Sequence, residues 1–214
     1  MSKSIGKYLA ALLLLAPIAI SVHAQPEKYL PGTHYIVLET PQRTADPEKI
    51  EVMEIFWYGC GHCFRFQPLV ENWHANMADD IVFVQLPAVW NSLMQVHAQA
   101  FYTAEAMGVL PQVHTPLFNA LNLEGNRLQN ERQIATLFAK YGVNEEEFGK
   151  VFNSFSVRTK VNQLERKMRD YQIQSTPNMS VNGKYLISTN EAVRTQQEML
   201  DVVDFLVAKE RAAR

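Results

Sequence analysis

The sequence predicts an α/β fold whose sheet is interrupted by a long helical insertion. Residues 50–57 and 81–86 are apolar runs with the length and composition of buried strands, and an amphipathic helical stretch separates them. Residues 175–187 have the pattern of a hairpin, and an amphipathic helix follows it. The stretch between the second strand and the hairpin far exceeds the ~30 residues of a strand–helix–strand unit. We therefore expect one sheet with helices on both faces and an inserted helical domain.

Composition excludes several classes of protein. The chain has 214 residues, of which 47% are hydrophobic and 20% charged, so it has enough apolar surface for a globular core. Its formal net charge of −2 argues against binding driven by nucleic-acid phosphates. Two cysteines are too few for a disulfide-dense scaffold or a four-thiolate zinc site. We expect neither a nucleic-acid partner nor a metal.

The first 24 residues have the organisation of a secretory signal peptide. Lys3 and Lys7 precede an apolar stretch over residues 8–20, and small residues lead to a cleavage position after Ala24. The apolar stretch is shorter than the ~20 residues of a spanning helix, which favours a cleaved signal over an uncleaved anchor. We expect export to a compartment where thiols can be held oxidised, which means the periplasm for a bacterial protein.

Both cysteines lie in one motif, Cys60-Gly61-His62-Cys63, between the strand at 50–57 and a helical face over 64–77. A helix N-terminus leaves backbone N–H groups without intrahelical partners and favours negative charge, so the pKa of Cys60 should be low. Cys63 lies within one turn and can close a disulfide with it. A structural disulfide and a metal site are the alternatives, but so short a loop adds little stability and no further ligands are paired. A catalytic dithiol is the favoured interpretation.

Two polar residues near the cysteines carry further predictions. His62 can hydrogen-bond to the Cys60 thiolate or place positive charge beside it, unless it is an ordinary exposed turn residue. Glu54 interrupts the apolar strand six positions before Cys60. If Glu54 is buried, desolvation raises its pKa; the alternative is an exposed strand face.

The insertion should contain at least three amphipathic helices. Their apolar stripes cover residues 93–107, 134–141 and 157–171, and Asn144 has the position of a helix cap before a further short helix. We place the inserted domain at residues 91–165 and the surrounding domain at 25–90 plus 166–214. His97 lies on an apolar stripe and is expected to be a satisfied core residue.

The last elements are a hairpin and a helix. Asn182-Gly183 is a turn signal between two short apolar runs. Thr189 or Asn190 is expected to cap a helix that continues to about Lys209.

With these motifs together, the chain resembles the thioredoxin superfamily. The dithiol at a strand–helix junction, the distant Thr176-Pro177 before a hairpin, the helical insertion and the export signal narrow the resemblance to DsbA-type periplasmic disulfide oxidases. It implies a cis Thr176–Pro177 bond that faces the dithiol and shapes a peptide-binding groove. It also implies that Glu54 assists proton transfer at the resolving cysteine. Gly61 departs from the proline usual in that family, which leaves the strength of the oxidant open.

The resemblance implies that a Cys60–Cys63 disulfide oxidises the thiols of reduced, unfolded secreted proteins and is restored by a DsbB-like inner-membrane protein. No organic cofactor is needed, and we expect a monomer. An apolar groove around Trp57, Tyr58, Pro177 and the insertion would hold the unfolded chain. One alternative is a disulfide reductase or isomerase, although no dimerisation segment is expected ahead of the catalytic domain. The other is a periplasmic peptide-binding chaperone without redox activity.

Overall fold

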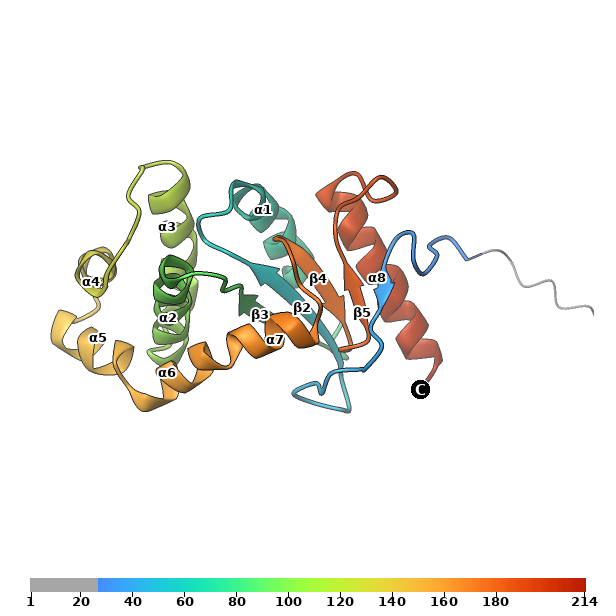
Figure 1. Ribbon diagram of the computed structural model, residues 1–214, viewed down its shortest axis with the longest axis horizontal. Helices are drawn as coiled ribbons and strands as arrows, with labels where there is room; N and C mark the ends of the chain where they lie inside the picture. The colour runs from blue at the N-terminus through green and yellow to red at the C-terminus, as the bar shows by residue number, and fades with distance from the viewer. Residues whose placement is uncertain (1–26) are drawn as a thin grey trace, which may run out of the picture.

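The computed structural model describes residues 27–214, which form a mixed five-stranded sheet with a large helical excursion (Figure 1). The predicted signal peptide lies outside the described residues. The sheet order is β1-β5-β4-β2-β3, in which β2 and β3 run parallel and the other neighbours pair antiparallel. In chain order the elements are β1 (Ile36–Val37), β2 (Ile50–Phe56), α1 (Gly61–Ala75), β3 (Ile81–Pro87), α2 (Ser92–Ala106), α3 (Leu110–Asn122), α4 (Glu131–Ala139), α5 (Glu145–Phe152), α6 (Phe155–Asn162), α7 (Leu164–Asp170), β4 (Asn178–Val181), β5 (Tyr185–Ile187) and α8 (Gln196–Ala212).

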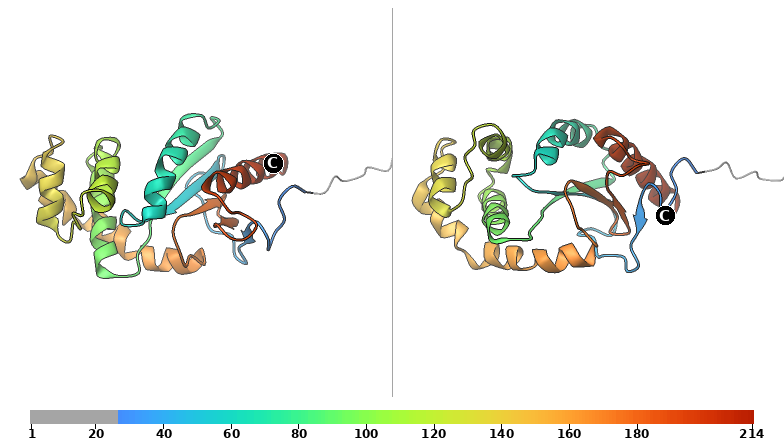
Figure 2. Two further views of the ribbon diagram at one scale, coloured as in Figure 1. Left: turned by 90° about the horizontal axis from the view of Figure 1, so that it is seen from above. Right: turned by 45° about the horizontal axis from the view of Figure 1, so that its top comes forward.

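Strand β2 is buried on both faces, and its alternating side chains divide the core into two clusters. Ile50 and Val52 pack with α8 and with the buried side of α1, whereas Met53 and Ile55 belong to the cluster that continues into the insertion. The two faces are visible in Figure 2, where α1 and α8 lie on one side of the sheet and α7 on the other. The predicted α/β sheet with helices on both faces is confirmed.

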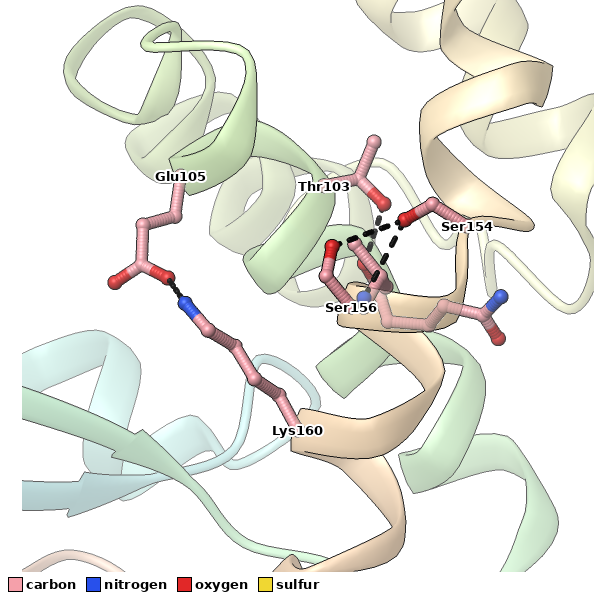
Figure 3. Close-up of polar contacts among 7 residues, drawn as sticks. Thr103, Glu105, Ser154, Ser156 and Lys160 are labelled. Carbon is pink, nitrogen blue, oxygen red and sulfur yellow. Dashed lines mark hydrogen bonds and ion pairs between the residues drawn. The ribbon is translucent and has the colours of Figure 1, made fainter.

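Helices α2 to α6 gather at one end of the sheet and form the helical excursion (Figure 1). Helix α2 packs on α3, α5 and α6, and its buried side chains contribute to the larger core cluster. An exposed ion pair joins α2 to α6, with Lys160 Nζ 2.5 Å from Glu105 Oε2 (Figure 3). Ser154 caps α6 by accepting a hydrogen bond from the backbone N–H of Val157. The insertion is therefore continuous with the main core.

Two predictions about the helices were wrong, and one helix was missed. The stripe over residues 157–171 is not one helix, because the chain breaks at Gln163 into α6 and α7. Helix α8 begins at Gln196 with Thr195 as its cap, while Asn190 instead accepts hydrogen bonds from the backbone N–H groups of Ala192 and Val193. Helix α3 was not predicted; Pro111 and Pro116 obscured its apolar face. Asn144, as predicted, caps α5.

In the described part of the chain, no helix combines the length and the apolar character needed to span a bilayer.

Candidate active site

Cys60 is the N-cap residue of α1, and Cys63 lies in the first turn of that helix. The Cys60 side chain accepts a hydrogen bond from the backbone N–H of Cys63, with 3.3 Å between nitrogen and sulfur. The chain reaches this position because β2 is followed by a tight turn, in which the N–H of Cys60 bonds to the carbonyl of Trp57. Both cysteines are free; Cys60 is partly exposed and Cys63 is fully buried.

The surroundings of Cys60 favour its thiolate and lower its pKa to about 5. The largest cause is a hydrogen bond from the Cys63 side chain. Thr176 and the backbone N–H groups of Cys63 and His62 act in the same direction, while partial burial opposes them. The unpaired N–H groups of the helix terminus therefore contribute as predicted, but the second thiol contributes most.

Cys63 behaves in the opposite way. Burial raises its pKa far above the ordinary value, and its hydrogen bond to Cys60 and the charge of that thiolate raise it further. In the reduced protein one sulfur is therefore a nucleophilic thiolate at neutral pH, and the other keeps its proton.

Thr176 and Pro177 lie against the dithiol, although 116 residues separate Thr176 from Cys60. The Thr176–Pro177 peptide bond is cis. The Cys60 sulfur lies 3.5 Å from the carbonyl oxygen of Thr176, to which it donates a hydrogen bond when it is protonated. Thr176 is half-buried and Pro177 is buried, so Thr176 is the more accessible of the two residues.

The hydrogen bond of the His62 side chain is to Arg65 and not to either sulfur. The side chain is exposed, and its Nδ1 lies 3.1 Å from Nη2 of Arg65. Because a guanidinium can only donate, Nδ1 accepts this hydrogen bond and carries no proton in this arrangement. His62 contributes its backbone N–H to Cys60. The backbone carbonyl of His62 accepts a hydrogen bond from the Gln196 side chain at 2.6 Å. The structure thus pairs the His62 side chain with the Arg65 guanidinium of the same helix.

Glu54 is buried on the face of β2 that α1 covers. Only 3% of its surface is exposed, and burial raises its pKa to about 7. Its carboxylate accepts a hydrogen bond from Gln85 Nε2 at 2.8 Å, which partly offsets the desolvation. The predicted burial is confirmed, and Glu54 can change protonation state near neutral pH.

Sequence reasoning missed two members of this buried group, Gln85 and His114. Glu54 and Gln85 are paired neighbours in the parallel register of β2 and β3, and Gln85 Nε2 also lies 3.2 Å from His114 Nε2. His114 Nδ1 is 2.8 Å from the hydroxyl of Tyr58. The signal for Gln85 was available, because it interrupts an apolar strand at the same offset from the first isoleucine as Glu54 does. His114 was hidden in the unpredicted helix α3.

Two aromatic residues after β2 have different positions. Tyr58 is 1% exposed, so its side chain is not part of the surface of the groove expected around it. Trp57 is half-buried and donates a hydrogen bond to Nδ1 of His97 at 3.0 Å. His97 also bonds to the carbonyl of Arg127, which confirms that it is a satisfied core histidine.

The arrangement defines a class of protein: a thioredoxin-fold oxidoreductase, in which one low-pKa cysteine and one buried cysteine face a cis-proline loop. In the part of the chain that the structure describes, no group of side chains is arranged to hold a metal ion. The paired sulfurs and the cis-proline loop are the groups that thiol–disulfide exchange uses in such a site.

Comparison with known proteins identifies the family of this chain within that class. A family profile described as the DSBA-like thioredoxin domain matches residues 76–201. The thiol:disulfide interchange protein DsbA of Pseudomonas aeruginosa is 37% identical over 205 residues, which covers 96% of both chains. Its counterpart in Azotobacter vinelandii is 36% identical over 209 residues, covering 98% of this chain and 97% of the relative. This chain belongs to the DsbA family.

Solved structures agree with that assignment. The crystal structure of P. aeruginosa DsbA superposes with a TM-score of 0.82 at 37% identity, covering 86% of this chain and 96% of that one. The oxidoreductase DsbA of Xylella fastidiosa gives a TM-score of 0.80 at 30% identity, with 86% and 98% covered. The fold class predicted from the sequence, a thioredoxin-like fold with a helical insertion, is therefore confirmed.

Proposed function

We propose that this thiol:disulfide interchange enzyme introduces disulfide bonds into newly exported proteins in the periplasm, with Cys60 and Cys63 as its redox-active pair. The observation that carries the proposal is the contrast between the two sulfurs, since the pKa of Cys60 is lowered to about 5 while that of buried Cys63 is raised. A stabilised thiolate stabilises the reduced enzyme, and the disulfide form is then a stronger oxidant. The DsbA relatives support the same direction.

The reaction begins with the Cys60–Cys63 disulfide and a thiolate on a reduced, unfolded protein. The substrate sulfur bonds to Cys60 Sγ, and the electron pair of the broken disulfide goes to Cys63 Sγ, which takes up a proton. A second substrate thiolate then attacks the substrate sulfur of the mixed disulfide. Cys60 leaves as a thiolate, so the substrate has lost two electrons and the enzyme has gained them. The lowered pKa of Cys60 makes it a good leaving group.

Other residues at the site have supporting roles in this proposal. The carbonyl of Thr176 and the adjacent Pro177 face the dithiol and would hold an extended substrate backbone beside Cys60. Glu54 would exchange a proton during the formation and loss of the Cys63 thiolate, because its own pKa lies near neutrality. His62 would act through its backbone N–H.

The partners follow from this chemistry. The substrates are unfolded secreted chains with free thiols, and a DsbB-like inner-membrane protein would reoxidise the enzyme. The predicted signal peptide supports a periplasmic location. We propose that the enzyme works as a monomer.

A redox titration against glutathione, followed by the fluorescence of the protein, tests the proposal. A potential near −120 mV, the value typical of DsbA itself, supports an oxidase, whereas one near −270 mV would indicate a reductase. A second assay follows the oxidative refolding of a reduced secreted protein. The Cys60→Ser/Cys63→Ser variant should have no activity there, and retained biological activity of that variant would instead support a peptide-binding chaperone.

A further inference from the structure

We propose that Gln85 and His114 are positioning residues that form, with Tyr58, a reversible hydrogen-bond chain behind the dithiol. When Glu54 gains or loses its proton, the Gln85 amide turns over and His114 changes tautomer while staying neutral. The hydrogen-bond chain depends only on the folded structure. Its use in thiol–disulfide exchange rests on the proposed function.

The first step of the argument is the position of one Gln85 atom. Nε2 lies 2.8 Å from Glu54 Oε2 and 3.2 Å from His114 Nε2, so a single end of the amide faces both groups. When Glu54 is ionised, the NH₂ group can donate to both. When Glu54 is protonated, a half-turn of the amide brings Oε1 to the same place, where it accepts from the carboxyl O–H and from N–H at His114 Nε2. Both states satisfy the end of the amide that faces Glu54 and His114.

The second step is the far side of the imidazole. Nδ1 of His114 faces the buried hydroxyl of Tyr58 at 2.8 Å, and a hydroxyl can donate or accept. With Glu54 ionised, Nδ1–H donates to Tyr58. With Glu54 protonated, the Tyr58 O–H donates to bare Nδ1. The net change is one proton, gained by Glu54, while the imidazole moves its own proton from one nitrogen to the other.

His97 shows why this freedom is special to His114. Its Nδ1 accepts from the indole N–H of Trp57, which can only donate, and its Nε2 faces the carbonyl of Arg127, which can only accept. His97 is therefore fixed in the Nε2–H tautomer. Both partners of His114, in contrast, can either donate or accept a hydrogen bond. His97 therefore serves as a reference histidine with a fixed tautomer in the same protein.

A cavity beside the hydrogen-bond chain connects it to solvent. A cavity of about 490 Å³ lies between α1, α3 and β3, with Glu54 and His114 in its wall. Exposed Glu71, His74 and Glu105 also line it. Protons can therefore exchange with Glu54 through this cavity, whose lining includes neither cysteine and neither Thr176 nor Pro177.

Burial keeps His114 neutral throughout, and nearby charge acts on Glu54 instead. Burial lowers the pKa of His114 to about 4, well below the value near 7 at which Glu54 titrates. Among the groups packed around Glu54, Glu71 on α1 raises its pKa through charge repulsion, and Tyr58 stays protonated because burial raises its pKa. Glu54 is thus the group expected to change charge between pH 5 and 8.

Nuclear magnetic resonance of the full-length reduced protein tests this directly. Carbon-13 shifts of the Glu54 carboxyl report its charge, and long-range proton–nitrogen correlations report each histidine tautomer. From pH 8 to pH 5, His114 should pass from Nδ1–H to Nε2–H with the same midpoint as Glu54, while His97 stays in the Nε2–H form. The proposal is wrong if Glu54 titrates while His114 keeps one tautomer, or if His114 becomes doubly protonated in that range.

Two variants separate coupling from mere packing. Gln85→Met removes the amide, so the Glu54 midpoint should rise, because the carboxylate loses its donor, and the His114 tautomer should no longer follow it. Tyr58→Phe leaves the ring in place but removes the hydroxyl partner of Nδ1, and should fix His114 as Nε2–H. Gln67→Met is the matched control, because Gln67 is buried beside the same cavity but bonds to Glu71 and Thr115 instead. Unchanged coupling in the first two variants would overturn the proposal.

These measurements need no substrate, so they are independent of the redox potential. A reducing potential would contradict the proposed function and leave the chain intact. A fixed His114 tautomer with an oxidising potential would contradict only the chain.

Discussion

Cys60 and Cys63 lie three positions apart, but their environments move their pKa values in opposite directions. Cys60 receives hydrogen bonds at the end of a helix, whereas Cys63 is enclosed by the core. The Cys60 thiolate needs space and hydrogen-bond donors around it. The glycines on either side of it, Gly59 and Gly61, differ in how much room they have for a side chain.

We predict that Gly59→Ala disrupts the site and Gly61→Ala does not. A Cβ on residue 59 would clash with the Trp57 ring, because it would lie much closer than a normal van der Waals contact, and only a shift of the indole, which donates a hydrogen bond to His97, could relieve the clash. A Cβ on residue 61 would lie 3.6 Å from its nearest neighbour, the Arg65 guanidinium. We expect Gly59→Ala to lose about 1–3 kcal/mol in urea unfolding and Gly61→Ala less than about 0.5 kcal/mol. Equal losses in both would contradict this account.

The pH dependence of stability should differ between the reduced and oxidised proteins. A lowered thiol pKa stabilises the folded reduced form at high pH, and this contribution is lost as the pH falls through about 5. Lowering the pH from 7 to 4 should therefore reduce the unfolding free energy of the reduced form, relative to the oxidised form, by about 1–2 kcal/mol, after allowance for partial exposure. Denaturant unfolding of both forms measures it, and a pH-independent difference would count against a stabilised thiolate.

The sequence was informative at the residue scale where a polar residue interrupts an apolar strand. Glu54 was found in this way, and Gln85 had the same signal. The orientation of His62 toward Arg65 was not predictable, because it depends on a side-chain rotamer and not on spacing.

At the scale of elements, helix ends decide how the site is held. Thr195 and Glu198 form a capping box at the start of α8, and the neighbouring Gln196 donates a hydrogen bond to the carbonyl of His62. The N-terminus of α8 is thereby tied to the first turn of α1.

We predict that Thr195→Ala destabilises the protein by about 1 kcal/mol, because the cap oxygen is lost from the N–H of Glu198. Thr189→Ala is the matched control, since this exposed threonine stands where the sequence had suggested the cap. Thermal or urea unfolding should separate the two. A larger loss at Thr189 would show that the helix begins earlier than described.

Element boundaries were the least predictable part of the fold. Apolar periodicity marked α2 and α4 closely and found α8 but not its start, because each buries one continuous stripe. It could not reveal the break at Gln163, since α6 and α7 continue nearly the same stripe. Helix α3 was not predicted because Pro111 and Pro116 both look like helix breakers in the sequence. Pro111 is tolerated because it occupies the first turn, where a missing N–H costs nothing.

At the scale of the molecule, the larger core cluster joins the insertion to the sheet. Met53 and Ile55 of β2 share it with Phe148 of α5, so the inserted helices have no separate core. The division into two sequence domains, a prediction from chain length and periodicity, therefore does not require two unfolding steps.

We predict that Phe148→Ala lowers the stability of the whole protein by about 3–5 kcal/mol in a single transition. Phe148 is fully buried and packs against Phe138 and Phe152. Far-UV circular dichroism reports the helices, and the fluorescence of Trp57, Trp73 and Trp90, all outside α2 to α7, reports the rest.

Both signals should shift to the same lower denaturant midpoint. Phe155→Ala is the control, because that ring is 86% exposed and should contribute less than about 0.5 kcal/mol. Two separated transitions would mean that the insertion unfolds on its own.

The most direct test of the account is the ionisation of Cys60 in the reduced protein, followed by thiolate absorbance near 240 nm, with Cys60→Ser as the blank. We expect one thiol to ionise with a midpoint near pH 5, and Cys63 to remain protonated throughout the neutral range. A midpoint above pH 8, that of an ordinary thiol, would contradict both the stabilised thiolate and the oxidising role built on it.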